Sequence, residues 1–289
     1  YMQNFIKALK SALEKKWSLL FFIVIIGGCS NLDLLYFFAE NKIYGFTDEY
    51  LDISPHQESR VRNQISSLIV WHRKDMLPRY ARFLDEQATA IETGAWSRAQ
   101  FSKTFETIRV LLDKTVRGAT PFIAEVIIEN ITPAKIEHIQ KQMVKDRTQR
   151  LEEFESETIN ERTERHSKEI SRFMGNLNDE QITVIKNHNN AGMASGRRWI
   201  ENLDYRQKAF INFIATQPQE SELNSFIYRI IMNAHEITDR DYFSISEARW
   251  IRLENMYFGI IEHSSENQRR KLISTLRSYA SDMVALSIK

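Results

Sequence analysis

Apolar residues after position 50 recur at the three- and four-residue spacing of an amphipathic helix, and few residues interrupt the pattern. Ile136, Ile139 and Met143 form one such series. The chain has 9 Gly and 5 Pro in 289 residues, too few for the tight turns of a β-sandwich, a propeller or a doubly wound sheet. The pattern predicts an all-α fold, an elongated multi-helix bundle.

Four predicted helices begin with the same local chemistry. Each follows a residue whose side chain can accept a hydrogen bond from a free amide of the first turn: Ser54, Thr132, Asn178 and Ser265. A glutamine stands three residues later in three of them, as a capping box requires: Gln57, Gln181 and Gln268. Pro55 and Pro133 fall at the first helical position, where a missing N–H is tolerated.

The longest stretch without a helix breaker is 134–174. As one continuous helix it would extend on the order of 60 Å. Its middle, 155–169, carries charges of alternating sign at helical spacing, typical of a solvent-exposed helix. We therefore predict a long, partly exposed helix that projects from the body or bridges two lobes, and that ends at Gly175.

A second long helix is expected over 179–216, and three shorter ones over the C-terminal third. Gly192 and Gly196 lie four residues apart within the second long helix. This spacing favours close approach of another helix. Anion binding, with Arg197 and Arg198 after the second glycine, is the alternative.

The first thirty residues indicate where the protein is located. Four lysines and the single acid Glu14 precede an uncharged run, Trp17 to Ile26. As a helix this run covers about 15 Å, half of a bilayer's ~30 Å hydrocarbon core. It is typical of the apolar region of a signal peptide.

The next residues, Ile26-Gly27-Gly28-Cys29-Ser30, resemble a bacterial lipobox, and Cys29 is the only cysteine in the chain. The resemblance implies cleavage before Cys29, attachment of lipid to its thiol and, because Ser30 rather than aspartate follows, sorting to the periplasmic face of the outer membrane. Two or more acyl chains would hold the protein in that membrane. The alternative is a single transmembrane anchor over 17–38 with a free thiol.

These observations predict three regions. Residues 1–28 would be a cleaved signal peptide, and 29–50 a lipid-anchored tether with an aromatic segment that either packs on the domain or lies at the bilayer surface. Residues 51–289 would form the helical domain, with the alternative of two lobes joined by the 133–174 helix.

A second cluster of unusual residues lies at 71–81. Pro78 removes a helical hydrogen bond and predicts a kink near Lys74. Trp71 and Tyr80 would pack at the bend. Arg73 and Arg79 would pair with carboxylates or backbone carbonyls; the alternative is a site for an anionic ligand made by His72, Arg73 and Arg79.

This Trp-His-Arg and Leu-Pro-Arg-Tyr block is similar to that of an uncharacterised family of Gram-negative lipoproteins, defined as a domain of unknown function. Residues 265–285 resemble the end of the same family. The resemblance implies location and fold, and no catalytic residues. Separately, Ile53-Ser54-x-x-Gln57 and Leu177-Asn178-x-x-Gln181 are similar to the Leu-Thr-x-x-Gln starts of small periplasmic stress chaperones and metal-responsive adaptors.

Catalytic and metal-binding motifs are missing from the sequence. No HExxH, GxSxG, Walker or GxGxxG motif occurs, and no two of the seven His stand three or four residues apart. We expect no metal, no cofactor and no catalytic residues; His235, Glu236 and Asp239 fit solvated side chains better than a metal site. A net charge of +1 gives no electrostatic case for nucleic acid.

Three functions stay open at this point. The leading hypothesis is a non-enzymatic lipoprotein, anchored to the membrane through Cys29, whose helical body binds another envelope protein or polymer. The second is a chaperone-like or envelope-stress adaptor. The third is an envelope enzyme, which would need carboxylates or a Ser/His/Asp set converging in one cleft.

Overall fold

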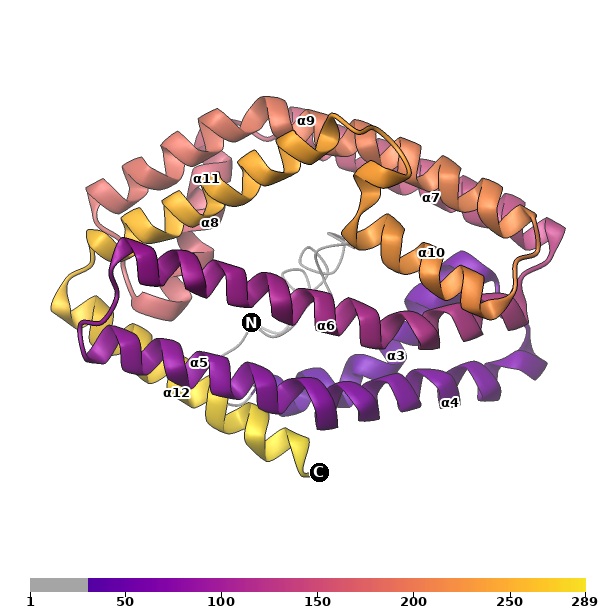
Figure 1. Cartoon of the computed structure of the whole chain (residues 1–289), viewed down its shortest axis with the longest axis horizontal. Helices are drawn as coiled ribbons and strands as arrows, with labels where there is room; N and C mark the ends of the chain where they lie inside the picture. The colour runs from indigo at the N-terminus through magenta and orange to yellow at the C-terminus, as the bar shows by residue number, and fades with distance from the viewer. Residues whose placement is uncertain (1–30) are drawn as a thin grey trace.

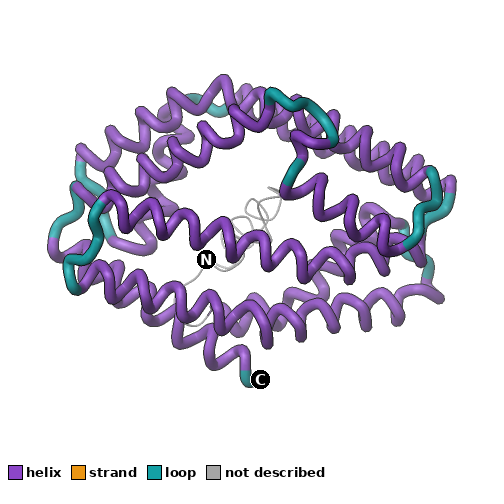
Figure 2. The backbone as a smooth tube through the Cα atoms, in the orientation of Figure 1, coloured by secondary structure: helices purple, strands orange, loops and turns teal. Residues whose placement is uncertain are grey.

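The computed structural model describes residues 31–289, and within them every regular element is helical. Figure 1 shows the helices arranged as a flattened, elongated ring, with α6 across the front and α4 and α5 along one long edge; Figure 2 shows the short loops between them. The elements are α3 (Asn31–Leu51), α4 (Pro55–Trp71), the π-helix η2 (His72–Met76), α5 (Leu77–Glu92), α6 (Arg98–Asn130), α7 (Pro133–Ser156), α8 (Ile159–Met174), α9 (Asp179–Ala215), α10 (Glu220–Met232), the 3-10 helix η3 (Ala234–Glu236), α11 (Tyr242–Glu262) and α12 (Glu266–Ser287). The predicted all-α fold is confirmed.

The predicted helix starts are confirmed residue by residue. Ser54, Thr132, Asn178 and Ser265 are the N-caps of α4, α7, α9 and α12. The glutamine accepts from the backbone N–H of the cap residue in all three predicted capping boxes, at 3.0 Å for Gln181 and 2.9 Å for Gln268. Local sequence therefore decides where these helices begin.

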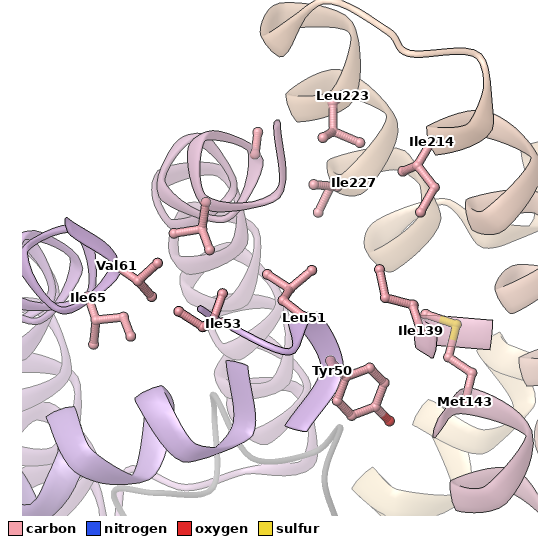
Figure 3. Packing of buried hydrophobic residues seen from close by; sticks show 12 residues of the cluster. Tyr50, Leu51, Ile53, Val61, Ile65, Ile139, Met143, Ile214, Leu223 and Ile227 are labelled. Atoms are coloured by element: carbon pink, nitrogen blue, oxygen red, sulfur yellow. The ribbon is translucent and has the colours of Figure 1, made fainter. Parts of the chain in front are cut away.

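The core is divided into three clusters of buried hydrophobic residues. The first joins α3, α4, α6, α7, α9 and α10, and Figure 3 shows its side chains pointing toward one another from these helices. The second joins the first turns of α3 with η2, α5, α6 and α12. The third joins α8, α9 and α11. The long helices α6 and α9 each run between two clusters.

The predicted continuous helix over 134–174 is wrong. α7 ends at Ser156, Glu157 is extended, and Thr158 caps α8 in a capping box with Glu161. Arg165 holds the Glu157 carboxylate through two hydrogen bonds of 2.7 and 2.9 Å. α7 contributes to the first cluster and α8 to the third, so the stretch joins two clusters as two helices. Gly175, with φ at 87°, ends α8 as predicted.

Residues 31–50, predicted to belong to a tether, form a helix packed on the body. Leu32 is buried beside Met283 and Leu286 of α12, and Tyr50 and Leu51 are buried in the first cluster. The helix continues through Gly45, and Ile43 and Phe46 on either side of it pack against the first cluster. Among the described residues, no helix is long and apolar enough to cross a bilayer.

The predicted close approach of another helix occurs at Gly196 and not at Gly192. A Cβ on Gly196 would lie 2.5 Å from the Phe154 ring of α7, so this glycine does permit close packing of two helices. Nothing lies within 4 Å of the same position on Gly192. Arg197 pairs with Glu155 of α7 and Arg198 with Glu201 and Asp239.

Candidate functional site

The predicted lipidation site lies outside the described residues. Cys29 and its neighbours Ile26, Gly27, Gly28 and Ser30 all precede Asn31, where the described chain begins. Asn31, two positions after Cys29, is already helical as the first described residue of α3.

The first two turns of α3 expose an apolar face. Phe37 is 75% exposed, and Leu34 and Phe38 are also exposed, whereas Leu32 and Tyr36 on the opposite side pack into the second cluster. The phenyl rings of Phe37 and Phe38 meet edge to face at 5.0 Å. Soluble surfaces rarely gather large apolar side chains in this way without covering them. We call Leu34, Phe37 and Phe38 the α3 outer face.

Where the sequence predicts a kink near Lys74, the structure has a π-helix, His72–Met76. In a regular α-helix the proline ring would clash with the carbonyl of Lys74 and leave it without a donor. Here His72 to Met76 widen by one residue, and the N–H of Leu77 donates to the carbonyl of His72, five residues back. Pro78 then stands in the first turn of α5, where it is tolerated. π-helical turns of this kind are frequent at functional sites, so the side chains here need individual inspection.

Trp71 lies against the backbone of α6. A Cβ on Gly118 would approach the indole of Trp71 to 1.9 Å, so only glycine at 118 lets the ring lie there. The indole also contacts Phe122 of α6 at 6.0 Å between ring centroids. The sequence predicted that Trp71 packs at the bend, but its partner Gly118 carried no local signal.

His72 and Tyr80 form buried polar contacts that involve four helical elements, α3, η2, α5 and α6. The Tyr36 hydroxyl lies 2.6 Å from Nδ1 of His72, and the Tyr80 hydroxyl is hydrogen-bonded to the Thr115 hydroxyl of α6. Burial lowers the pKa of His72 to about 4 and raises that of Tyr36. Both groups are thus neutral at pH 7, and they share one hydrogen bond.

The two arginines of the block bind backbone carbonyls. Arg73 Nε donates to the carbonyl of Leu286 in α12 at 3.0 Å, and Arg79 Nε donates to that of Asp75, also at 3.0 Å. Together with the neutral His72, these contacts fit the packing interpretation of the block. It joins α3, α5, α6 and α12 around a π-helix.

The glutamines of two capping boxes also bind each other. Gln181 of α9 is fully buried, and Gln268 Nε2 donates to its Oε1 at 2.9 Å. Gln268 Nε2 also lies 2.6 Å from the Asn176 carbonyl, and Gln181 Nε2 lies 2.8 Å from that of Ile260. The chaperone-like motif at 177–181 is therefore fully engaged in holding the starts of α9 and α12 together.

Residues 31–289 contain no group of three His, Cys, Asp or Glu side chains able to hold a metal ion. The His235 ring instead contacts Phe243 at 4.8 Å, and Asp239 pairs with Arg198. Hollows near His235 and near Gly175 are open to solvent. The second is lined by Lys271 and by Ser265, whose hydroxyl accepts from the Gln268 N–H in the cap of α12.

One set of functional candidates escaped the sequence analysis: Arg206 of α9 with Arg249 and Arg252 of α11, which we call the α9–α11 arginine cluster. The structure pairs none of the three with a carboxylate in the part of the chain it describes. The signal was present, because Arg249 and Arg252 share one face of α11 while Glu247 and Glu254 share another. Only the packing of α11 on α9 reveals it.

Comparison with known proteins adds one finding. The model of a family of unknown function, DUF6279, matches residues 49–242. This range includes the Trp71 to Tyr80 block that carries the resemblance, whereas 265–285 lies beyond it. No curated protein and no solved structure matches the chain.

Proposed function

Since the chain belongs to the DUF6279 family, whose function is unknown, we propose from its own residues that it is a non-enzymatic lipoprotein of the outer membrane. Its lipidated Cys29 holds a helical body on the periplasmic side, and that body binds an envelope protein or polymer. The lipobox-like Ile26 to Ser30 and the charged and apolar segments before it support the anchor.

The structural observation that supports this proposal most is the α3 outer face. Phe37 is eight residues from Cys29, so its Cα lies at most about 16 Å from that of Cys29, with two residues extended and six helical. A lipid on Cys29 therefore brings Leu34, Phe37 and Phe38 to the membrane surface. Amphipathic helices bury such residues about 5–10 Å into the headgroup region. The anchor thus explains why these side chains are exposed.

The lack of a convergent catalytic set among the described residues directs the proposal toward binding. In the Trp71 block, His72 is hydrogen-bonded to Tyr36 and Arg73 Nε to a backbone carbonyl, while Arg73 Nη2 is buried without a hydrogen-bond partner; the buried glutamines are engaged in caps. What these groups do is hold distant helices together. A rigid helical body next to a membrane suits a binding or structural role.

The test uses the full chain in a Gram-negative cell. We expect mass spectrometry of the purified protein to show Cys29 as the first residue, carrying lipid, and membrane fractionation to place the protein in the outer membrane. Cys29→Ala removes the lipid and keeps the leader attached. Ser30→Asp is the matched control for sorting: it leaves the lipid in place and moves the protein to the inner membrane. An unmodified thiol with Trp17 still attached upstream contradicts the proposal.

A further inference from the structure

The α9–α11 arginine cluster lies where two helices cross. Arg249 stands over the Trp199 ring at 5.8 Å, and Arg252 Nη2 donates to the Ser195 hydroxyl at 2.6 Å. Trp199 and Ser195 both belong to α9, the helix that also carries Arg206. Arg150 of α7 reaches the same Trp199 ring at 5.9 Å, so its guanidinium and that of Arg249 are at most about 12 Å apart. Two guanidinium groups, from α7 and α11, therefore lie near one indole, and Arg252 follows Arg249 one turn later on α11. Arg150 has the carboxylates of Asp146 and Glu153 nearby, so the arginines without a carboxylate partner are those of α9 and α11.

Within the cluster, Arg206 has buried hydrogen-bond donors without an acceptor. Its Nε and Nη2 are buried and have no hydrogen-bond acceptor. Burial and the nearby Arg249 lower its pKa, and Tyr242 is its only neighbour with an opposing effect. Leaving buried donors of a charged group unpaired is costly. Something with negative charge is needed there.

The acidic residues of the same helices are engaged elsewhere. Glu247 of α11 pairs with Arg109, and Glu254 with Arg98, both on α6. Glu201 of α9 pairs with Arg198. α11 thus directs Glu247 and Glu254 toward α6 and its two arginines toward α9.

His188, a further neighbour of the α9–α11 arginine cluster, does not supply negative charge either. His188 of α9 lies 3.2 Å from the backbone carbonyl of Arg252 through Nδ1. Its pKa is lowered by burial first, and also by Arg252 and Arg249. His188 is thus neutral at pH 7, and its ring N–H donates to the carbonyl.

We propose that the α9–α11 arginine cluster binds an oxyanion, a phosphate group carried by a small molecule or by a lipid headgroup. Guanidinium groups present planar forks of donors that match phosphate oxygens, and a tetrahedral anion accepts from several forks at once, whereas a carboxylate offers two oxygens. The face of the Trp199 ring attracts the guanidinium groups of Arg249 and Arg150 by cation–π interaction. The Ser195 hydroxyl holds Arg252 in place. The proposal does not rest on the lipid anchor, because all of these residues lie in the helical body.

Equilibrium dialysis of the detergent-solubilised full chain against radiolabelled inorganic phosphate, at low ionic strength in chloride, tests the proposal. We expect saturable binding, and at least tenfold weaker affinity in Arg249→Gln. Arg82→Gln is the matched control, since it removes an exposed arginine of α5 by the same substitution; we expect it to bind as the unchanged protein does. No saturable binding, or equal affinity in Arg249→Gln, overturns the proposal.

Two further measurements complete the test. Phosphate should raise the thermal unfolding midpoint of the unchanged chain and leave that of Arg249→Gln where it is, since a ligand stabilises only the form that binds it. A purely structural arginine would give no such difference, and that result would overturn the proposal. If Arg249→Gln fails to fold, Arg252→Gln takes its place.

Competition by short-chain phosphatidylglycerol identifies a lipid headgroup as the source of the bound phosphate group. Failure of this lipid to compete identifies a small phosphate-bearing molecule.

Discussion

At the scale of single residues, the block at 71–80 shows both what sequence reasoning predicts and what escapes it. Pro78 and its neighbours predict a local disturbance of the helix, because the loss of a helical hydrogen bond is a local effect, and the structure has a π-helix at this place. The partners of Trp71 and His72 escape, since Gly118 and Tyr36 lie far away in the chain. A glycine in the middle of a helix has no distinguishing sequence context.

Gly118→Ala tests the close approach of Trp71. The new methyl group would meet the indole at 1.9 Å, so either the ring or α6 must move. We expect the free energy of unfolding to fall by about 1–3 kcal/mol, the usual cost of overpacking. Gly45→Ala is the control: it has open space around it in α3 and should gain about 0.5–1 kcal/mol. Urea unfolding followed by circular dichroism measures both; a gain in Gly118→Ala would contradict the packing described.

His72 should make stability depend on pH. Its pKa is about 4 in the folded chain and about 6.5 when unfolded. Between these values the unfolded chain binds a proton that the folded chain does not, so the stability present above pH 6.5 is lost as pH falls toward 4. At pH 4.5 the loss from this one group is about 2–3 kcal/mol.

Urea unfolding at pH 7 and pH 4.5 measures this effect. We expect His72→Gln to lose less stability between the two pH values than the unchanged protein. His56→Gln, which alters an exposed histidine at the start of α4, should leave the pH dependence unchanged. Equal pH dependence in all three proteins would show that His72 is not buried as described.

At the scale of elements, helix starts were predictable and one helix end was not. Capping boxes are written in four consecutive residues, so Ser54, Asn178 and Ser265 could be identified directly. Thr158 and Glu161 have the same relation, but they lie among charges that suit an unbroken helix equally well. The break is held by Arg165 on Glu157, a contact that exists only once the chain has turned.

The glutamine pair between α9 and α12 allows a comparison of two capping boxes. Gln181→Ala removes a cap and leaves the buried amide of Gln268 without one of its partners, whereas Gln57→Ala removes a half-buried cap at the start of α4. We expect losses of about 2–3 kcal/mol for Gln181→Ala and about 1 kcal/mol for Gln57→Ala. Thermal or urea unfolding measures the loss of stability in each variant. Equal losses would mean that the hydrogen bond between Gln181 and Gln268 contributes nothing beyond the two caps.

At the scale of the whole molecule, the fold class could be predicted from the sequence and the arrangement could not. Helical periodicity and sparse glycine and proline suffice for an all-α body. The ring, however, is closed by contacts between distant segments: α5 with α12, and Arg277 with Glu92 at 3.0 Å across 185 positions. The arginine cluster belongs to this scale as well, since it needs α11 to lie on α9. The predicted anchor at Cys29 stays a prediction.

The packing of the first turn of α3 on the last turn of α12, in the second cluster, has a mechanical consequence. Leu32, in the first turn of α3, is buried with Leu286, in the last turn of α12, and Arg73 binds the carbonyl of Leu286 as well. If the proposed lipid anchor holds the chain just before α3, a pull exerted through it would load the last turn of α12 and the π-helix at the same time. Tension from a moving bilayer would be shared by several helices in shear instead of peeling α3 away alone.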